Sequence, residues 1–367
     1  MLAYIKDHHD IIEALTVLAA STSSRSLTSG AGLDRYLAAS LLQKAIRRGE
    51  PEFAWRAASY LVENYREYFW RRLPIIALED IGLANLKLVE LVLATSSDTS
   101  VRAKCGGCIR VASLLIDHMC ESIKDRSSDD LYDVLTRDHA VEEHRARLLE
   151  CNPDVLFNPF EWGEGGVVKT ANKLAALAGC GAEVPAMGLN RRRWKSAIEA
   201  LDETFVSPVV REVALLGVDV TGCVLAPMML AASGRSQITG ATIDDPTLEP
   251  TSMADVPLWA LGLHTRVGLD GFRRFIAQSR KMKAILRESA TGDVSPAKMV
   301  GGLVFRLDCG QLKRRLDWQT GNELKSRATN LGWGVRDEAV PEALAILRNE
   351  YDLLSECRAA ALRDYLK

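Results

Sequence analysis

Three consecutive arginines, followed by a tryptophan and a lysine, form the first candidate for chemistry in this sequence. Arg191, Arg192, Arg193, Trp194 and Lys195 begin a helical pattern. Arginine and lysine neutralise nucleic-acid phosphates, and an indole ring can stack on an unpaired base. A second interpretation stays open, in which the cations are solvated and the tryptophan packs inward. The cluster is therefore a candidate DNA-binding site.

A denser basic cluster occupies residues 271–283. In helical geometry Arg273 and Arg280 share one face, and Arg274 and Lys281 share another. Apolar anchors for such a helix are Phe272, Phe275, Ile276 and Met282. Basic amphipathic helices bind phosphates and also acidic protein partners, and the sequence does not separate the two uses. The DNA-binding candidates in this cluster are Arg273, Arg274, Arg280, Lys281 and Lys283.

Cysteines and histidines are weaker candidates, for a redox or metal site. Cys105 and Cys108 form a C-x-x-C pattern, which in redox sites follows a strand and begins a helix. Here a polar stretch precedes it, so helix packing by small residues is the favoured interpretation. His139 and His144 lie five residues apart, a spacing that does not place both on one helix face. No metal and no cofactor are therefore expected.

Two adjacent carboxylates near the end of an apolar helical stretch need cationic partners. Glu79 and Asp80 lie where exposed helix carbonyls are partly negative, so we expect them to contact cations or backbone amides of a neighbouring element. The upstream cations that could reach them are Lys44, Arg47 and Arg48, at the end of a helix that Gly49 stops.

These stretches resemble the helical region that follows the ATPase module in the RarA/MgsA family, relatives of the clamp loader and of the Werner helicase-interacting ATPase. The first matching positions are Gln43, Lys44, Ile46, Arg47, Gly49, Pro51 and Ala54. The second are Arg71, Arg72, Leu73, Ala77, Glu79, Asp80, Ile81, Gly82, Leu83 and Ala84. Ala45 replaces the family's usual serine, and the match fades after residue 84.

The resemblance implies a clamp-loader-collar-like domain that self-assembles, with Lys44, Arg47, Arg71, Arg72, Glu79, Asp80 and Gly82 as structural residues of the family motif. It does not imply ATP hydrolysis here. A phosphate-binding loop needs Gly-Lys followed by Ser or Thr, and no Gly-Lys dipeptide occurs in the sequence. About forty residues precede the matching helices, fewer than a domain of typical size. We therefore expect no enzymatic activity.

Hydrophobic periodicity predicts an all-α fold. Helices are expected at 35–48, 52–64, 65–83, 86–94, 103–124, 129–149, 167–177, 191–204, 209–216, 257–286, 313–331 and 341–365. Residues 300–307 are the one stretch that could form a strand, and 237–253 read as a long loop. Asn, Pro and Gly residues after 150 mark a boundary. The predicted organisation is an N-terminal segment and loop (1–33), a collar-like helical domain (34–150) and a second mainly helical domain (151–367).

Composition limits the remaining possibilities. The 367 residues are 47% hydrophobic and 26% charged, enough for a large buried core. The longest uncharged apolar run, 220–234, is shorter than the roughly 20 residues of a membrane-spanning helix. Scattered cysteines and an N-terminus without signal-peptide character favour a cytoplasmic protein with reduced thiols. With a net charge of -2, DNA contacts depend on local clusters. A third, weaker cluster consists of Lys313, Arg314, Arg315 and Trp318.

Three functions from different classes remain open. The first, which we favour, is a non-catalytic accessory protein of DNA replication or repair that self-assembles and contacts DNA through its basic helices. The second is a protein-interaction module, for instance phage or plasmid encoded, that binds a host replication ATPase or clamp loader without contacting DNA. The third is an enzyme with a site scattered over Cys105, Cys108, His139 and His144.

Overall fold

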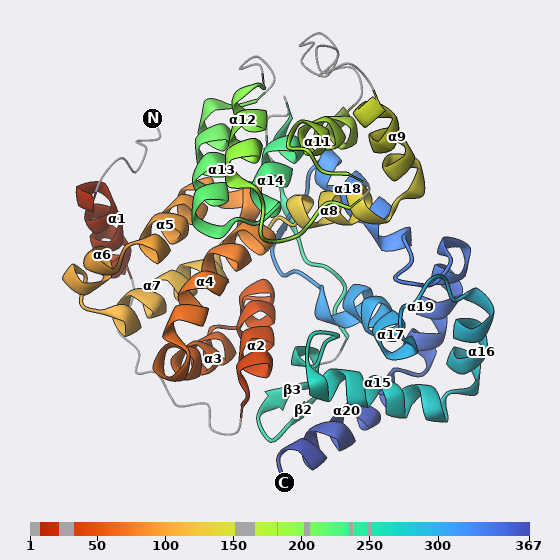
Figure 1. Cartoon of the computed structure of the whole chain (residues 1–367). Helices are drawn as coiled ribbons and strands as arrows, with labels where there is room; N and C mark the ends of the chain where they lie inside the picture. Colours follow the sequence, from red (N-terminus) through yellow and green to blue (C-terminus); the bar gives the residue numbers. More distant parts are fainter. Residues whose placement is uncertain are drawn as a thin grey trace. The chain divides into compact units, whose positions relative to one another are not determined.

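The computed structural model describes residues 8–21, 33–150, 166–181, 183–201, 206–234, 238, 240–248 and 251–367. Helices dominate these residues, so the predicted all-α fold is confirmed (Figure 1). Strands are limited there to four segments of two residues, which form two antiparallel pairs, β1 with β4 and β2 with β3. The expected boundary just after residue 150 lies outside the described residues.

The chain divides into two compact units. Unit 1 comprises Met1–Ser26, Arg66–Ile243 and Arg314–Ala328, and unit 2 comprises Leu27–Tyr65, Asp244–Lys313 and Thr329–Lys367. Each unit therefore combines segments that are distant in the sequence. This differs from the sequential organisation expected above, because the helices at 35–48 and 51–64 belong to unit 2 whereas those between 66 and 150 belong to unit 1.

Unit 1 contains most of the helices. Its α-helices are α1 (His8–Ser21), α4 (Arg66–Ile76), α5 (Leu86–Ser97), α6 (Thr99–Lys104), α7 (Cys108–Glu121), α8 (Ser127–Arg137), α9 (His139–Glu150), α11 (Gly166–Leu177), α12 (Arg191–Glu199), α13 (Pro208–Thr221), α14 (Leu225–Ser233) and most of α18 (Gln319–Asn330). Its other elements are the π-helix η1 (Ala77–Ile81), the 3-10 helix η2 (Gly82–Asn85), β1 (Thr242–Ile243) and β4 (Arg315–Leu316).

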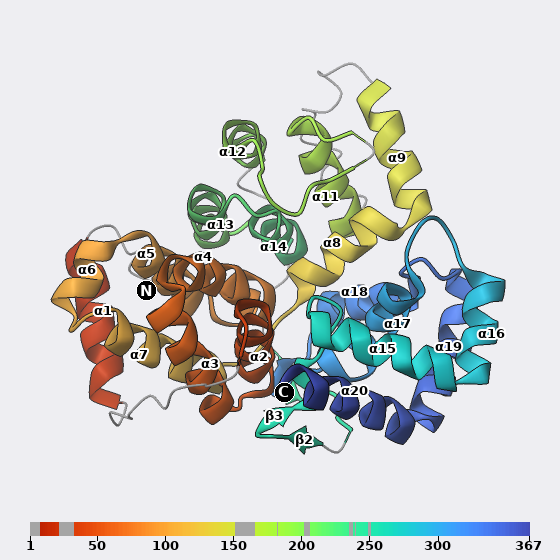
Figure 2. The same cartoon turned by 60° about the horizontal axis from the view of Figure 1, so that its bottom comes forward.

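The centre of unit 1 is α14, in which every residue is buried. Helices α8, α11 and α13 surround it (Figures 1 and 2). Gly217 of α13 allows the closest approach, since a Cβ there would lie 2.7 Å from the Ala226 side chain. Hydrophobic periodicity does not predict this helix, because a uniformly apolar segment has no amphipathic period.

Unit 2 combines helices from three parts of the sequence around a packed core. Its α-helices are α2 (Arg35–Arg48), α3 (Pro51–Asn64), α15 (Arg266–Gln278), α16 (Arg280–Ser289), α17 (Pro296–Val304), α19 (Val340–Asn349) and α20 (Tyr351–Tyr365). The remaining elements are β2 (Ser252–Met253), β3 (Val256–Pro257), the 3-10 helices η4 (Leu258–Ala260) and η6 (Asp337–Ala339), and the π-helix η5 (Phe305–Cys309).

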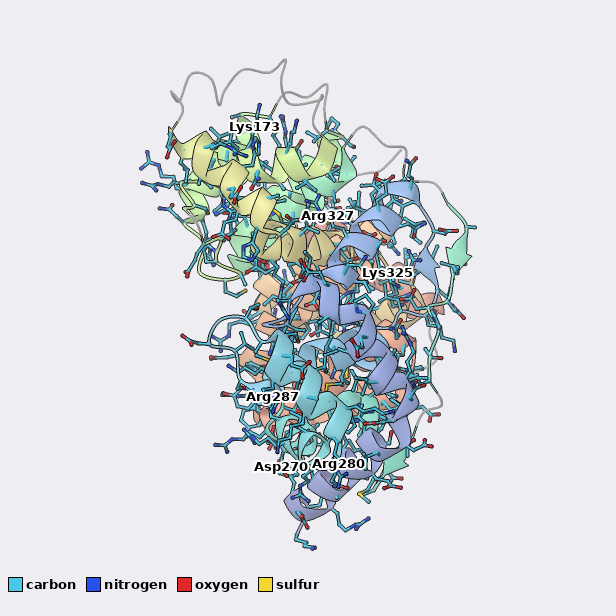
Figure 3. The ribbon with its side chains drawn as sticks, turned by 90° about the vertical axis from the view of Figure 1, so that its right-hand side faces the viewer. Lys173, Asp270, Arg280, Arg287, Lys325 and Arg327 are labelled. Atoms are coloured by element: carbon cyan, nitrogen blue, oxygen red, sulfur yellow. The ribbon has the colours of Figure 1, made fainter. Side chains whose placement is uncertain are left out.

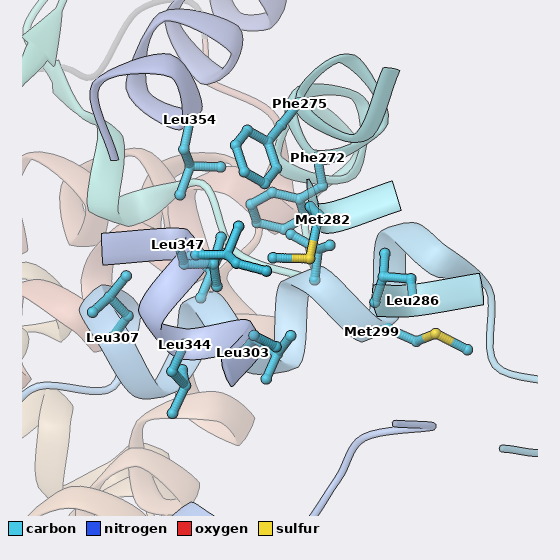
Figure 4. Packing of buried hydrophobic residues seen from close by; sticks show 14 of the residues in the cluster. Phe272, Phe275, Met282, Leu286, Met299, Leu303, Leu307, Leu344, Leu347 and Leu354 are labelled. Carbon is cyan, nitrogen blue, oxygen red and sulfur yellow. The ribbon is translucent and has the colours of Figure 1, made fainter. Parts of the chain in front are cut away.

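The core of unit 2 lies beneath α15 and α16. Phe272, Phe275 and Met282 from these helices meet Leu303 of α17 and Leu347 of α19 (Figure 4). All five side chains are fully buried. This core fixes the inner faces of α15 and α16 and leaves their outer faces to carry charge.

Local sequence signals set the two ends of α2 and the start of α3. The Asp34 side chain accepts hydrogen bonds from the backbone of Tyr36 and Leu37, which caps α2. Gly49 ends the helix with φ 65°, in the left-handed region that favours glycine. Pro51 occupies the first turn of α3, where its missing N–H has no helical partner to lose.

Several predicted elements differ from the structure, among them the helix expected at 313–331, which begins only at Gln319 and follows the strand β4. The strand expected at 300–307 is wrong, because α17 continues into the π-helix η5. The helix expected at 257–286 is broken at Ser279, whose backbone is extended and whose hydroxyl caps α16 through Met282 N. The helix expected at 103–124 is interrupted at Gly106 and Gly107, with φ of 96° and 92°. Pattern reading missed these breaks because the apolar spacing continues across them.

Candidate nucleic-acid interface

Helix α12 of unit 1 carries the first basic cluster, and its tryptophan does not fit the base-stacking prediction. Asn190 caps the helix by accepting a hydrogen bond from Arg193 N. Trp194 is only 1% exposed and packs on the same inner face as Ala197 and Ile198. The prediction that Trp194 stacks on a base is therefore wrong, and the inward-packing interpretation holds.

Most cations of α12 contact residues of neighbouring elements. Lys195 Nζ pairs with Asp219 Oδ2 of α13 at 2.8 Å. Arg191 lies beside Gly222, which ends α13, since a Cβ on that glycine would be 3.4 Å from Arg191 Nε. A Cβ on Gly179, just after α11, would overlap the Arg193 guanidinium. Cations are stabilised near helix C-termini by the partly negative carbonyls, so this cluster has a structural explanation.

Helix α15 of unit 2 contributes less free charge than expected. Arg274 Nε lies 2.8 Å from Asp270 Oδ2, and its Nη1 lies 2.9 Å from Asp364 Oδ2 on α20. Two carboxylates thus offset its charge, which makes Arg274 a poor phosphate ligand. Arg273 is exposed and, within the described residues, forms no ion pair.

Helix α16 is the best basic surface among the candidates. Met282, Ile285 and Leu286 point into the core and hold the helix in place. Its exposed cations are Arg280, Lys281, Lys283 and Arg287. Arg280, Lys283 and Arg287 are spaced by three and four residues, so they line one outer face, which we call the α16 basic row. Figure 3 labels its two end members, Arg280 and Arg287.

Ion pairing leaves most of this charge available. In the part of the chain that the structure describes, Arg280, Lys281 and Lys283 form no ion pair. Arg287 lies 3.6 Å from Glu288, but both side chains are largely exposed, so water screens this pair. The predicted faces, with Arg273 beside Arg280 and Arg274 beside Lys281, assumed one continuous helix. The break at Ser279 separates α15 from α16, and the row forms on α16 alone.

The third basic cluster is structural within unit 1. Arg315 Nη1 donates to Asn322 Oδ1 at 2.6 Å. Trp318 is buried, and its indole N–H donates to Asp125 Oδ1 at 3.1 Å. These contacts tie the segment before α18 to the segment before α8, and Trp318 offers no free aromatic ring.

Glu79 and Asp80 contact a cation, as the sequence predicts. Arg126 Nη1 lies 3.1 Å from Glu79 Oε1 and 2.8 Å from Asp80 Oδ1, and Arg126 also pairs with Asp129. Gly82 ends the π-helix with φ 47°, and a Cβ there would lie 2.7 Å from Asp125 O. Only glycine fits this position without a shift.

The three cations at the end of α2 make contacts inside unit 2. Lys44 Nζ donates to Ala260 O at 3.0 Å, Arg47 Nη1 donates to Cys309 O at 3.0 Å, and Arg48 Nη2 lies 2.9 Å from Asp308 Oδ1. The expected contact of these cations with Glu79 and Asp80 joins different units and stays a prediction. Arg71 is exposed and Arg72 half-buried on α4.

Several of these partners were not predicted. Arg126 and Asp308 are buried, and Arg358 Nη1 lies 2.9 Å from Asp308 Oδ2. A signal for Asp308 exists in the sequence, because Asp308-Cys309-Gly310 repeats the spacing of Asp80-Ile81-Gly82. No comparable local signal marks Arg126 or Arg358, whose roles depend on tertiary packing.

The cysteine and histidine candidates gain no support from the geometry. Burial raises the pKa of the Cys105 thiol, which disfavours the reactive thiolate. Within the described ranges, no group of three or more His, Cys, Asp or Glu side chains could hold a metal ion. The same residues include no helix of the length and apolarity that a membrane span requires.

Comparisons with known proteins add no family. No protein-family model, curated protein or solved structure matches the chain. The resemblance to the RarA/MgsA helical region therefore remains an expectation from the motif residues alone.

Proposed function

We propose that this chain is a non-catalytic accessory protein of DNA replication or repair, which binds nucleic acid through the α16 basic row and self-assembles. The observation that carries the DNA-binding part is the row itself. Arg280, Lys283 and Arg287 are exposed on one face of a helix whose opposite face is locked into a core.

Physical chemistry favours phosphate as the ligand of this surface. Successive cations along one helix face present several positive charges to a polyanion, and each neutralised phosphate releases condensed counterions. The row needs no base recognition, so the expected binding is independent of sequence. Arg273 on α15 adds a further exposed cation in the same unit.

The self-assembly and replication parts rest on the motif resemblance. The buried ion pairs of the motif residues Glu79 and Asp80 with Arg126 support a structural role for those two positions. Sedimentation velocity at tens of micromolar tests assembly. A strictly monomeric protein would contradict this part of the proposal.

The test of nucleic-acid binding compares two charge-matched variants. The triple change Arg280→Ala, Lys283→Ala and Arg287→Ala should weaken binding to a labelled single-stranded oligonucleotide. It should also reduce the slope of log affinity against log salt by about 2, since each lost contact contributes roughly 0.7. Fluorescence anisotropy at several salt concentrations measures both quantities.

The matched control removes three exposed cations from three other helices, with Lys87→Ala on α5, Lys298→Ala on α17 and Arg348→Ala on α19. It lowers the net charge by the same amount and should leave the slope nearly unchanged. Equal effects of the two triples would show that only overall charge matters and would contradict a specific interface.

A protein partner is the second candidate. A basic row on an amphipathic helix also complements an acidic protein surface, such as one on a replication ATPase or clamp loader. In that case the α16 triple would abolish capture of the partner, and the wild-type chain would ignore oligonucleotides even at low salt.

A further inference from the structure

Exposed aromatic side chains gather at one place in unit 2. Tyr36 is 51% exposed, and Tyr65 and Tyr365 are each 37% exposed. Among the described residues these are the exposed large aromatic side chains. They lie at the start of α2, just after α3 and at the end of α20. We call them, with Arg35 and Tyr60, the tyrosine patch.

Contacts within the patch hold the rings in place. The Arg35 guanidinium carbon lies 4.7 Å from the Tyr36 ring centroid and 5.8 Å from the Tyr65 ring centroid. Arg35 Nη2 also donates to the Tyr36 hydroxyl at 2.7 Å. The Tyr60 and Tyr65 rings have centroids 5.9 Å apart. The patch is thus ordered before any partner arrives, which lowers the entropy cost of binding.

Charges beside the patch permit a polyanion. Asp34 is engaged in capping α2 and in a hydrogen bond with the Tyr365 side chain. Asp364 pairs with Arg274 and with Lys367. Asp364 is therefore neutralised by cations and Asp34 is engaged by hydrogen bonds, whereas Arg363, two residues before Tyr365, is exposed and forms no ion pair within the described residues.

We propose that the tyrosine patch stacks unpaired bases of single-stranded nucleic acid. Every base has a π-face, and tyrosine rings and arginine guanidinium planes are the groups on which unpaired bases stack. Burial of Trp194 removes the stacking residue expected from the sequence, and the patch supplies exposed rings in the unit that carries the α16 basic row. This inference rests on the proposed nucleic-acid binding.

The test uses anisotropy with three probes: a single strand of thymidines, an abasic strand of equal length, and a duplex. Tyr36→Ala with Tyr65→Ala should weaken binding to the thymidine strand by roughly 10- to 100-fold and leave the salt slope unchanged, because stacking releases no counterions. Binding to the abasic strand and to the duplex should be unaffected. Tyr36→Phe with Tyr65→Phe keeps the rings and should bind the thymidine strand like the wild type.

Two outcomes would overturn the inference. If the alanine pair melts like the wild type and binds the thymidine strand equally well, the patch does not stack bases, although the α16 proposal stands. If the alanine pair loses affinity for the abasic strand and the duplex as well, the patch acts without stacking. A wild-type protein that binds none of the three probes at low salt would remove the proposed nucleic-acid function together with this inference.

Discussion

The two units share one local device and differ in its charge balance. In each unit an α-helix ends in a π-helical turn that carries a buried aspartate, followed two residues later by glycine: Asp80 and Gly82 in unit 1, Asp308 and Gly310 in unit 2. Around Asp80, the three carboxylates of Glu79, Asp80 and Asp129 pair with the guanidinium of Arg126. Around Asp308, two guanidiniums share a single carboxylate.

This difference determines whether protonation can change the net charge of each cluster. Burial raises the pKa of Asp129, and it raises the pKa of Asp130 to about 7, so the acidic cluster can take up protons. Arginine stays charged at all ordinary pH values, so the basic cluster has no such outlet. Tyr351 adds a third donor to Asp308, with its hydroxyl 3.1 Å from Oδ2. Asp308 is thus the hub on which unit 2 depends.

The largest effect is expected from Asp308→Ala. Arg48 and Arg358 would be left buried without their carboxylate, a situation that typically costs about 3–5 kcal/mol. Denaturant unfolding should show the same decrease in the free energy of unfolding at pH 5 and at pH 8. The control is Asp293→Ala, which removes an exposed carboxylate of the same unit and should cost little. Similar losses in the two variants would contradict the role of Asp308 as a hub.

A smaller and pH-dependent effect is expected from Arg126→Met. At pH 8 the buried carboxylates lose their cation, and the free energy of unfolding should fall by about 3 kcal/mol. At pH 5 the loss should shrink, because carboxylates of raised pKa can be protonated. The exposed Arg71→Met serves as the control on α4. A loss at pH 5 as large as that at pH 8 would remove the contrast between the two clusters.

The smallest effect concerns Asp130 alone. Its pKa is higher in the folded protein than in the unfolded chain, so the folded state binds more protons between about pH 4 and pH 7. Its contribution to stability is therefore lost as pH rises through this window. Asp130→Asn should flatten the decline by on the order of 1 kcal/mol, since the side chain is half-exposed. Thermal melts of both proteins between pH 4 and pH 8 measure this difference. The same pH dependence in Asp130→Asn and in the wild type would contradict the raised pKa of Asp130.

Features that depend on contacts between residues close in the sequence could be predicted, whereas features that depend on distant segments could not. The bounds of α2 depend on Asp34 and Gly49, which act on backbone groups within four residues, and the stop at Gly49 was predicted correctly. The demand of Glu79 and Asp80 for a cation was also correct. Arg126, which meets this demand, was not named from the sequence, because it is supplied by a distant segment.

Prediction of the candidate interface from the sequence also failed where contacts with distant segments matter. Helix periodicity identified Arg280, Lys281 and Lys283 of α16 but not Arg287. Only the structure shows that Ser279 separates these cations from α15 and that Asp270 and Asp364 pair with Arg274. Trp194 could stack or pack, and its burial depends on Ala197 and Ile198 together with the rest of unit 1. Exposure is a tertiary property, so no local pattern settles it.

The most direct test of the proposed function is the salt dependence of nucleic-acid binding by the wild-type chain. Anisotropy titrations of a labelled single strand from 50 to 300 mM salt should give a straight line of log affinity against log salt. With three to four phosphates neutralised, the slope should be about -2 to -3. No detectable binding at the lowest salt, or binding that does not change with salt, would contradict the account.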